Sequence, residues 1–562
     1  MKVVIVGGVA GGATAAARIR RLDEHAEIVV FEKSGYVSYA NCGLPYYIGG
    51  EIEDKRELTL QTPESFYARF RVDMRVHHEV IAVDVKAKTV KVRNLASGEV
   101  FSESYDKLIL STGARPIKPN FEGIDNERIF TLRTVEDTLR IKQFTEDKRP
   151  QSAVVVGGGF IGIEVSENLR RLGMDVTLVE AAPQVMAPFD GDMAALIHAE
   201  MVRNGIKLML GTMVEGFTAE GGVTVRLKDR EPQTADMAVL AIGVAPDTTL
   251  ARDAGLELGI KGSIVVDDRM QTSAPEVYAV GDAVQIKNFV TGKEGLISLA
   301  GPANKQGRIA ADNVCGRDSR YTGGQGSSVI KIFGLTAACT GINERTAKSL
   351  GLDCDKVVLS PMSHAGYYPG GSVMTMKVLF ERGTCRILGA QIIGRDGVDK
   401  RIDVIATAIR AGLKATELTE LDLAYAPPYS SAKDPVNMAG YMIENVCDGV
   451  LKQWHIEDAD SIVSRKDVTL LDVRTPEEFQ RGHIEGFLNI PVDELREGLS
   501  KLDKSKPVYV ICQSGLRSYI ASRILAGNGY EAYNFSGGYR FYAAVKGDRA
   551  CTERSLPCGK DI

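Results

Sequence analysis

This chain of 562 residues has little excess charge, since 68 basic side chains stand against 73 acidic ones and the net charge is −5. An even balance of this kind shows no footprint of nucleic acid or of an anionic membrane surface. No apolar run approaches the roughly 20 residues that cross a bilayer. Glycines from Gly7 onward interrupt the first apolar run where a secretory signal would still need apolar residues. We therefore expect a soluble, cytoplasmic protein that binds neither nucleic acid nor membrane.

Closely paired cysteines are also scarce. The chain has nine cysteines, an odd number, scattered mostly singly. Such usage fits a reducing compartment better than a disulfide framework. We expect no bound metal, and we expect ordinary packing or surface roles for five cysteines without a motif: Cys315, Cys339, Cys354, Cys385 and Cys447.

The length predicts three or four domains of about 150 residues each. An apolar run over 2–6 meets the glycines of 7–12, a helical pattern covers 13–22, and a strand over 27–31 ends at Glu32. A strand, glycine turn, helix and strand with an acid about 20 residues beyond the glycines is the layout of a dinucleotide-binding fold. The same layout returns from 153 to Glu180. The chain is thus predicted to contain two nucleotide folds.

The second glycine fingerprint is complete, with Gly157, Gly159 and Gly162 at the three positions that allow a tight turn, approach of a pyrophosphate and close helix packing. Glu180 can accept hydrogen bonds from a ribose 2′-hydroxyl and would repel a 2′-phosphate. Alanines follow it where NADP sites often have arginine. We expect this fold to bind NADH in preference to NADPH.

The first fingerprint has Val9 in place of the middle glycine. Two later segments, 111–114 and 277–283, nevertheless resemble the remaining flavin motifs of the two-dinucleotide flavoproteins. In that family the residue matching Asp282 hydrogen-bonds the ribityl chain of FAD, and the residue matching Glu164 lies near the flavin edge. The resemblance implies an FAD site built from Gly7, Gly8, Gly11, Gly12, Glu32 (on the adenosine ribose), Thr112, Gly113, Gly281 and Asp282.

Cys42 is expected to be a redox-active cysteine without a neighbouring thiol. Many flavin disulfide reductases have a second cysteine five residues on, where this chain has Tyr47. A lone redox cysteine cycles through a mixed disulfide with a small thiol, a persulfide or a sulfenic acid. The following Gly-Leu-Pro, with Pro45 in the first turn, suggests a helix start that would lower the thiol pKa and keep Cys42 as thiolate.

Residues 1 to about 446 resemble the coenzyme A-disulfide reductases, on the strength of the glycine turn at 7–12, the segment 38–45 around Cys42 and the segment 425–435. Related NADH peroxidases have a histidine in the first glycine turn, where this chain has Ala10, and this departure makes a peroxidase less favoured. An NADH oxidase with a Cys42 sulfenic acid and a redox-sensing binding protein stay open as alternatives.

The resemblance implies a homodimer in which Tyr367 and Tyr425 reach the active site of the other subunit. A phenol there could protonate or orient the leaving thiolate, and aromatic packing at the interface is the alternative. His364 is expected to be structural. The family's contacts to coenzyme A, together with two basic residues of the segment 66–71, give Thr14, Arg18, Arg21, Ser38, Asn41, Arg69, Arg71 and, from the partner chain, Lys433.

The segment 471–542 resembles a single rhodanese domain. Its loop 512–518 can turn successive N–H groups inward as an anion cradle, with positive charge from Arg517, so Cys512 should be a thiolate able to carry a second sulfur. Four residues separate Cys512 from Arg517, whereas related phosphatases have five, and Ile511 replaces their usual histidine. The tighter loop favours sulfur over phosphate. Asp472 and His483 are expected to brace the fold.

The fold class expected from these patterns is α/β, with two Rossmann-like domains, an α+β dimerisation domain and a rhodanese domain. The predicted boundaries are 1–112 with 247–322 for FAD, 113–246 for NADH, 323–446 for dimerisation, 447–460 as a linker that could let the last domain swing, 461–547 for the rhodanese domain and 548–562 as a tail. Cys551 and Cys558 of this tail could bind metal or resolve a persulfide, and a plain exposed tail is favoured. The predicted activity is reduction by NADH, through FAD and Cys42, of coenzyme A persulfide, polysulfide or coenzyme A disulfide, with sulfane sulfur carried on Cys512.

Overall fold

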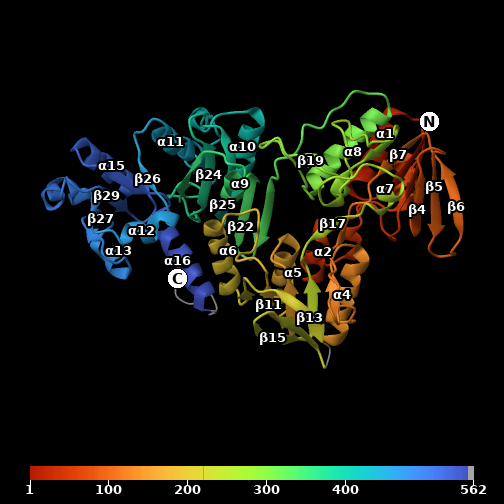
Figure 1. Cartoon of the computed structure of the whole chain (residues 1–562), viewed down its shortest axis with the longest axis horizontal. Coiled ribbons are helices and arrows are strands. Elements are labelled where there is room, and N and C mark those ends of the chain that lie inside the picture. Colours follow the sequence, from red (N-terminus) through yellow and green to blue (C-terminus); the bar gives the residue numbers. More distant parts are fainter. Residues whose placement is uncertain (219–220, 555–562) are drawn as a thin grey trace. The chain divides into compact units, whose positions relative to one another are not determined.

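The computed structural model describes residues 1–218 and 221–554, with side chains up to residue 547 (Figure 1). The chain forms two compact units. Unit 1 consists of residues 1–181 and 211–326, and unit 2 consists of residues 182–210 and the chain from 327 onward. Within the described residues, no helix has the length and apolar character needed to cross a membrane.

The first sheet of unit 1 is parallel and has its apolar residues covered on both faces. Val3 and Ile5 of its central strand enter one core cluster, and Val4 and Val6 enter another on the opposite face. Continuous apolar runs are typical of parallel strands that are buried on both sides. The strands, in spatial order, are β18 (Val277–Ala279), β7 (Lys107–Leu110), β1 (Lys2–Val6), β2 (Glu27–Phe31) and β3 (Asp73–Arg75).

Helix α1 (Ala10–Leu22) connects β1 to β2 and packs against α8 (Ala300–Val314). The two helices can approach closely because glycines face each other at the contact: a Cβ on Gly307 would lie 2.4 Å from the carbonyl oxygen of Gly11. An antiparallel meander follows the first fold, with β4 (His78–Asp84), β5 (Thr89–Asn94) and β6 (Val100–Ser104).

The second nucleotide fold of unit 1 repeats the plan of the first. Strand β10 (Ser152–Val156) pairs in parallel with β11 (Asp175–Val179) on one side and β16 (Met237–Leu240) on the other, and β16 pairs with β9 (Ile129–Thr131). Helix α5 (Phe160–Arg171) follows β10, and α4 (Val135–Lys148) follows β9. A second meander is formed by β13 (Val214–Thr218), β14 (Val223–Leu227) and β15 (Arg230–Ala235).

Unit 2 contains an antiparallel sheet whose spatial order is β21 (Ser328–Ile332), β22 (Leu335–Gly341), β25 (Ile387–Gly394), β24 (Thr375–Glu381) and β23 (Cys354–Leu359). Helix α10 (Val398–Ala411) packs on β22 and β25, and α6 (Gly191–Arg203) also contacts this sheet. Helix α9 (Glu344–Ser349) precedes β23, and α11 (Pro435–Cys447) ends this part of the chain.

A parallel sheet forms the C-terminal part of unit 2, drawn in blue in Figure 1. Its spatial order is β26 (Gln453–Trp454), β30 (Ala532–Phe535), β29 (Val508–Ile511), β27 (Thr469–Asp472) and β28 (Leu488–Asn489). The accompanying helices are α12 (Ala459–Val463), α13 (Pro476–Arg481), α14 (Leu495–Gly498), α15 (Leu516–Gly527) and α16 (Gly538–Arg554).

The segment 447–460, predicted as a linker, is mostly built into the fold. Strand β26 pairs with β30, and Trp454 is 2% exposed, with its ring 4.5 Å from that of Phe535. Only residues 448–452 separate α11 from β26. The strand could not be predicted from this polar segment, because two strand residues and a single tryptophan give no hydrophobic periodicity.

The C-terminal sheet docks onto β23, the edge strand of the antiparallel sheet. The N–H of Val358 donates to Ser536 Oγ at 2.8 Å, and the amide of Gln453 donates to the carbonyl of Lys356 at 3.2 Å. Two side-chain contacts flank these bonds, the ion pair of Lys356 with Glu457 at 2.6 Å and the contact of His455 Nε2 with an Asp355 carboxylate oxygen at 3.3 Å. These contacts satisfy backbone groups that an edge strand leaves open. The C-terminal domain is therefore attached, and does not hang on a free linker.

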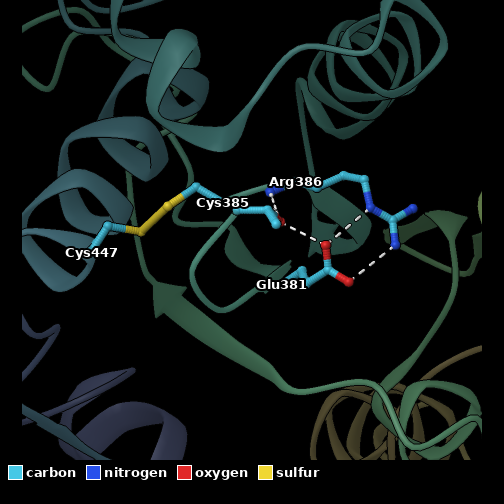
Figure 2. The surroundings of a disulfide bond; sticks show 5 residues. Glu381, Cys385, Arg386 and Cys447 are labelled. Atoms are coloured by element: carbon cyan, nitrogen blue, oxygen red, sulfur yellow. Dashed lines mark hydrogen bonds and ion pairs between the residues drawn. A yellow bond between two sulfur atoms is a disulfide. The ribbon is translucent and has the colours of Figure 1, made fainter.

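Cys385 and Cys447, expected to be unremarkable single cysteines, form a disulfide that closes a 62-residue separation (Figure 2). Cys385 lies in the turn between β24 and β25, beside the ion pair of Glu381 with Arg386, and Cys447 is the last residue of α11. The expectation was wrong because only the packing of α11 near that turn brings the two sulfur atoms together. Closing a loop of this length removes about 4 kcal/mol of unfolded-state entropy in the chain-entropy account.

Helix α16 continues to Arg554, so the first part of the predicted tail is helical. Cys558 lies outside the described residues, as does the side chain of Cys551.

Candidate active sites

The two glycine turns of unit 1 have the same backbone geometry. Gly7 and Gly157 have φ values of +98° and +111°, a region that favours glycine. A Cβ on Gly12 or on Gly162 would lie 1.9 Å from the carbonyl oxygen of the first glycine of its turn. The first and last glycines of each fingerprint are thus required by the turn and by the close packing of the helix.

Each turn is held by the acid at the end of the next strand. Glu32 accepts a hydrogen bond from the N–H of Gly8 at 2.9 Å, and Glu180 accepts one from the N–H of Gly158 at 2.6 Å. Glu32 also accepts from the N–H of Ser34, and burial raises its pKa. The carboxylates predicted to contact ribose therefore stand directly beside the turns that would carry the pyrophosphates.

The two helix starts fit a dinucleotide. Neither α1, which follows Val9, nor α5, which follows Gly159, has a side-chain cap or an acid in its first turn. Their first N–H groups are therefore available to an anion. A Cβ on Gly159 would meet open space, which leaves room for a phosphate close to the backbone. Val9 has φ −105°, so the residue that replaces glycine there is not strained.

The later flavin motifs lie at the same edge of the first sheet. Gly113 and Gly281 both have positive φ, and Thr112 Oγ1 donates to the carbonyl of Asp247 at 2.5 Å. Asp282 forms an ion pair with Arg133 at 2.7 Å. Arg133 escaped the sequence analysis because it lies outside the flavin motifs.

Cys42 lies in a 3₁₀ turn (Asn41–Gly43) that leads into α2 (Leu44–Ile48), with Pro45 in the first turn of the helix, as predicted. The thiol is accessible to solvent. Surrounding protein atoms nevertheless displace enough water to raise the pKa of Cys42, and the carboxylate of Glu164 raises it further. The predicted lowering of this pKa is wrong, because a helix of five residues contributes little field and an acid stands nearby.

Glu164 and Tyr46 form a pair beside Cys42. The hydroxyl of Tyr46 donates to Glu164 Oε1 at 3.3 Å. Burial raises the pKa of Glu164 to about 7, and burial and the Glu164 carboxylate together raise the pKa of Tyr46. A carboxyl group that titrates near neutral pH can give or take a proton under working conditions. Tyr46 was missed because an isolated tyrosine in a short helix carries no signal.

The two predicted tyrosines of unit 2 meet. The hydroxyl oxygens of Tyr367 and Tyr425 are 2.8 Å apart, and both side chains are exposed, at 76% and 46%. This hydrogen bond is the main cause that raises the pKa of Tyr425. His364 is buried and its Nδ1 bonds the carbonyl of Ala365, in keeping with a structural role.

Arg401 anchors the loops that carry these tyrosines. It is 1% exposed and donates to the carbonyl of Ser363, to Ser430 Oγ at 3.1 Å and to Asp434 Oδ2 at 3.1 Å. A direct backbone bond from Ala365 to Ser430 completes the connection. Arg401 was missed because a helical arginine is exposed in most sequences.

The residues predicted to contact coenzyme A fall into two groups. Arg18 pairs with Asp312 at 2.7 Å, and Thr14 Oγ1 donates to Asn304 Oδ1 at 2.7 Å, so these side chains bond neighbouring protein groups. Four cationic side chains are exposed and form no ion pair among the described residues: Arg21, Arg69, Arg71 and Lys433. Ser38 and Asn41 lie half-buried in the segment that holds Cys42.

Arg20, a residue of α1, brings the basic residues of unit 1 together. It is buried and donates to the carbonyls of Phe70 and Arg71 at the end of α3 (Pro63–Phe70), as well as to three carbonyls after α1. The arginines of α1 and the exposed Arg69 and Arg71 are held at one place by this side chain.

Cys512 is fully buried, in contrast to Cys42. Its sulfur accepts hydrogen bonds from the N–H of Gly515 at 3.1 Å and from the hydroxyl of Ser518 at 3.2 Å. The carbonyls of Cys512 and Gln513 accept from the first N–H groups of α16, at 2.7 and 3.2 Å. Because these carbonyls point toward α16, the following N–H groups of the loop can turn toward the sulfur, as the anion cradle requires.

The positive charge of Arg517 is already paired with an acid. Its guanidinium makes a bidentate pair with Glu478, at 2.7 and 2.8 Å, and this pair lowers the pKa of Glu478 to about 2. Asp472 pairs with the buried Arg474, and His483 stacks on Phe479, so both predicted bracing residues have structural contacts. The partner of Arg517 lies 39 residues away and could not be read from the loop motif.

A cluster of acids in unit 2 is neutralised by lysine. Oxygen atoms of Asp190, Asp192 and Glu344 lie close enough together to bind a metal ion. Lys377, 1% exposed, pairs with all three, and these carboxylates raise its pKa despite burial. The ammonium group of Lys377 thus supplies the positive charge.

Two nucleotide folds, a lone cysteine beside the flavin motifs and a C-terminal cysteine cradle together define a flavin-dependent disulfide oxidoreductase fused to a sulfur-carrying domain. Comparison with known proteins agrees. The model of the pyridine nucleotide-disulphide oxidoreductases matches residues 1–307, that of their dimerisation domain matches 327–435, and that of the rhodanese-like domain matches 455–544. The chain belongs to the pyridine nucleotide-disulphide oxidoreductase family.

Individual relatives are also similar. Coenzyme A disulfide reductase of Staphylococcus aureus (strain bovine RF122 / ET3-1) is 38% identical over 441 residues, which cover 78% of this chain and 99% of the relative. Reduced CoADR-RHD of Bacillus anthracis shares 48% identity with a TM-score of 0.95, covering 97% of this chain and 98% of that one. An NAD-dependent persulfide reductase from A. fulgidus shares 38% identity with a TM-score of 0.91, covering 96% and 100%.

Proposed function

We propose that this protein uses NADH to reduce coenzyme A persulfide, polysulfide or coenzyme A disulfide at Cys42, while Cys512 carries sulfane sulfur. The observation that supports this most is the pairing of two unlike sulfur sites in one chain. Cys42 is accessible and stands beside the flavin motifs, whereas Cys512 is buried among hydrogen-bond donors.

The two glycine turns would hold FAD in the first fold and NADH in the second, with Glu32 and Glu180 on the riboses. When bound, these cofactors supply the electron pair: NADH provides the hydride, and FAD passes two electrons to sulfur. The chain contributes the turns, the uncapped starts of α1 and α5, and the ion pair of Asp282 with Arg133 near the predicted ribityl position.

Cys42 would form the covalent intermediate. Its thiolate attacks one sulfur of the substrate S–S bond, a new bond to Cys42 forms, and the other sulfur leaves with the electron pair of the broken bond. The pair of Glu164 and Tyr46 is placed to exchange protons near this sulfur. Summed over the reaction, a persulfide, NADH and a proton give a thiol, hydrogen sulfide and NAD⁺.

Coenzyme A would be held by the predicted contact residues, with its phosphates near the exposed Arg21, Arg69 and Arg71. The protein would work as a cytoplasmic homodimer, a state supported by the match to the family's dimerisation domain. Tyr367, Tyr425 and Lys433 would then complete the active site of the other subunit, where a phenol protonates the leaving thiolate. We retain the FAD, NADH and dimerisation boundaries predicted from the sequence, shorten the linker to 448–452 and begin the rhodanese domain at residue 453, the start of β26.

The fusion to a sulfur-carrying domain favours persulfide over disulfide as the working substrate. Steady-state oxidation of NADH with coenzyme A persulfide, polysulfide and coenzyme A disulfide tests this, and kcat/KM should be highest for persulfide. A much higher kcat/KM for the disulfide would contradict the preference. Rapid oxygen uptake without any sulfur substrate would instead indicate an NADH oxidase.

A further inference from the structure

We infer that Cys385 and Cys447 form a separate thiol–disulfide exchange site, at which a small disulfide such as coenzyme A disulfide oxidises the pair and a small thiol reopens it. Cys447 exchanges with the small molecule, and Cys385 closes the bond from inside the protein. This site is independent of the reactions proposed at Cys42 and Cys512.

The two bonded cysteines differ in exposure. Cys385 is 9% exposed, whereas Cys447, at the end of α11, is an exposed residue (Figure 2). Exchange requires a thiolate to reach one sulfur of the disulfide, so access decides which of the two sulfur atoms is attacked. A molecule as large as coenzyme A therefore reacts at Cys447.

The backbone at Cys385 does not by itself account for a cysteine there. Its φ is +55°, in the left-handed region where residues other than glycine are uncommon. Its N–H donates to the carbonyl of Glu381 at 2.9 Å and its carbonyl accepts from the N–H of Ala415 at 2.7 Å, so the turn holds it in this conformation. Glycine or asparagine would adopt this φ at lower cost. A residue kept in such a conformation points to a use for its side chain.

Other contacts hold the two cysteines near each other when the bond is open. Helix α11 packs on the 3₁₀ helix η5 (Ala415–Glu420), where the amide of Asn437 donates to the carbonyls of Leu418 and Leu421 at 2.9 and 3.0 Å. The first residue of η5 is the one that bonds the carbonyl of Cys385. None of these contacts involves sulfur, so the dithiol keeps its two thiols in place. A pair held in this way can open and close reversibly.

The bond fastens the end of α11, from which the chain enters the C-terminal domain. Only residues 448–452 separate Cys447 from β26. In this segment the N–H of Leu451 donates to the carbonyl of Asn445 at 2.8 Å, and the carbonyl of Val450 accepts from Arg523 of α15. Opening the bond removes the cross-link from the last turn of α11, so the hydrogen bonds of this segment should open more often.

The exchange balances with coenzyme A disulfide as the oxidant. The Cys447 thiolate attacks one sulfur of this disulfide, a bond from Cys447 to that sulfur forms, and one coenzyme A thiolate leaves with the electron pair of the broken bond. The Cys385 thiolate then attacks the Cys447 sulfur and expels the second coenzyme A thiolate. Two protein thiols are oxidised, one coenzyme A disulfide is reduced to two thiols, and the two protons pass to coenzyme A. Excess coenzyme A runs the same steps backward.

Hydrogen exchange of the wild-type protein measures the effect of the bond on the fold. Amides of residues 445–452 should exchange roughly fivefold faster in the dithiol form than in the disulfide form, whereas amides at the start of α11 should not change. Equal exchange of 445–452 in the two forms would contradict the inferred fastening of this helix end.

Peptide mapping of the full-length protein without NADH tests the exchange itself. Protein reduced with dithiothreitol, and then freed of it, is incubated with coenzyme A disulfide, quenched with N-ethylmaleimide at intervals and digested for mass spectrometry. The wild type should pass through a coenzyme A adduct on Cys447 to a linked pair of peptides, and excess coenzyme A should separate them again. A pair that never links, or a link that survives excess coenzyme A, would overturn the inference. Neither outcome depends on whether Cys42 reduces persulfide or Cys512 carries sulfur.

Two single variants separate the roles of the sulfur atoms. Cys385→Ser should hold the coenzyme A adduct on Cys447, and Cys447→Ser should form an adduct on Cys385 at least about tenfold more slowly, because that residue is buried. Cys354→Ser, which removes a half-buried cysteine of the same sheet, is the matched control and should form the link at the wild-type rate. Equal rates of adduct formation on the two cysteines would refute the assigned order. The wild-type time course decides the inference even if a variant folds poorly.

Discussion

The sulfur sites at Cys42 and Cys512 differ in solvent exposure, in neighbouring charge and in hydrogen bonds to the sulfur. Cys42 is open to solvent, has an acid nearby, and its pKa is raised. Cys512 is closed off from solvent, accepts two hydrogen bonds, and lies in the loop between β29 and the 12-residue helix α15. A site that alternates between bonded and free sulfur needs a nearby proton carrier, whereas a site that stores sulfur needs fixed donors.

The difference also appears in the charged residues. Beside Cys42 the acid Glu164 has a pKa of about 7 and can change its charge under working conditions. At the loop that holds Cys512, the acid Glu478 has a pKa of about 2 and stays ionised, paired with Arg517 of that loop. One site is thus built for proton exchange and the other for constant charge.

The largest expected effect comes from exchanging each sulfur atom for oxygen. Cys42→Ser should reduce NADH-dependent turnover of both persulfide and coenzyme A disulfide by at least about a thousandfold, because the covalent intermediate is lost. Flavin reduction by NADH, followed by stopped-flow absorbance, should persist. Cys512→Ser should abolish sulfur transfer from thiosulfate and leave disulfide reduction intact.

Cys354→Ser is the matched control for both, since Cys354 is half-buried and has no assigned role. Normal persulfide reduction by Cys42→Ser would end the proposed division of labour between the two sites.

Glu164→Gln should move the titration of the Cys42 thiol to lower pH. Glu164 is ionised above about pH 7, where the thiol titrates, so its negative charge opposes thiolate formation, and glutamine removes that charge. Thiolate absorbance, measured against Cys42→Ser, checks the shift. Arg133→Met should shift the titration the opposite way, because Arg133 favours the thiolate.

Ser536→Ala should loosen the contact between the C-terminal domain and β23. The N–H of Val358 loses the hydroxyl that accepts its hydrogen bond, a change of about 1 kcal/mol, so hydrogen exchange at this amide should speed up roughly fivefold. Ser505→Ala, on an exposed turn, is the control. Unchanged exchange at Val358 would show that the bond to Ser536 does not hold the two sheets together.

The smallest effect is expected from Glu478→Gln. Glutamine can keep the cap at the start of α13 but no longer neutralises Arg517, so the mouth of the Cys512 site becomes more positive. The KM for thiosulfate should fall about threefold, in line with a partly exposed ion pair, and kcat should change little. A raised KM would mean that the pair positions Arg517 for the donor.

Much of the fold followed from the sequence. The glycine turns, the acids after the second strands and the helix start at Pro45 are local features, set by φ angles and by residues close together in the chain. The meeting of Tyr367 with Tyr425 could be anticipated only from the family resemblance, because 58 residues separate them.

The sequence alone identified Cys42 and Cys512 as the candidates for sulfur chemistry, since the residues around them form contiguous motifs. Tertiary structure decided the surroundings of each sulfur. It placed Glu164 near Cys42, paired Arg517 with Glu478, and brought the hydroxyl of Ser518 to the Cys512 sulfur as a hydrogen-bond donor. It also joined Cys385 to Cys447 and fixed the supposed linker against β23. The physical reason is that motifs record backbone turns, whereas charge, burial and hydrogen bonding depend on which distant residues fold into contact.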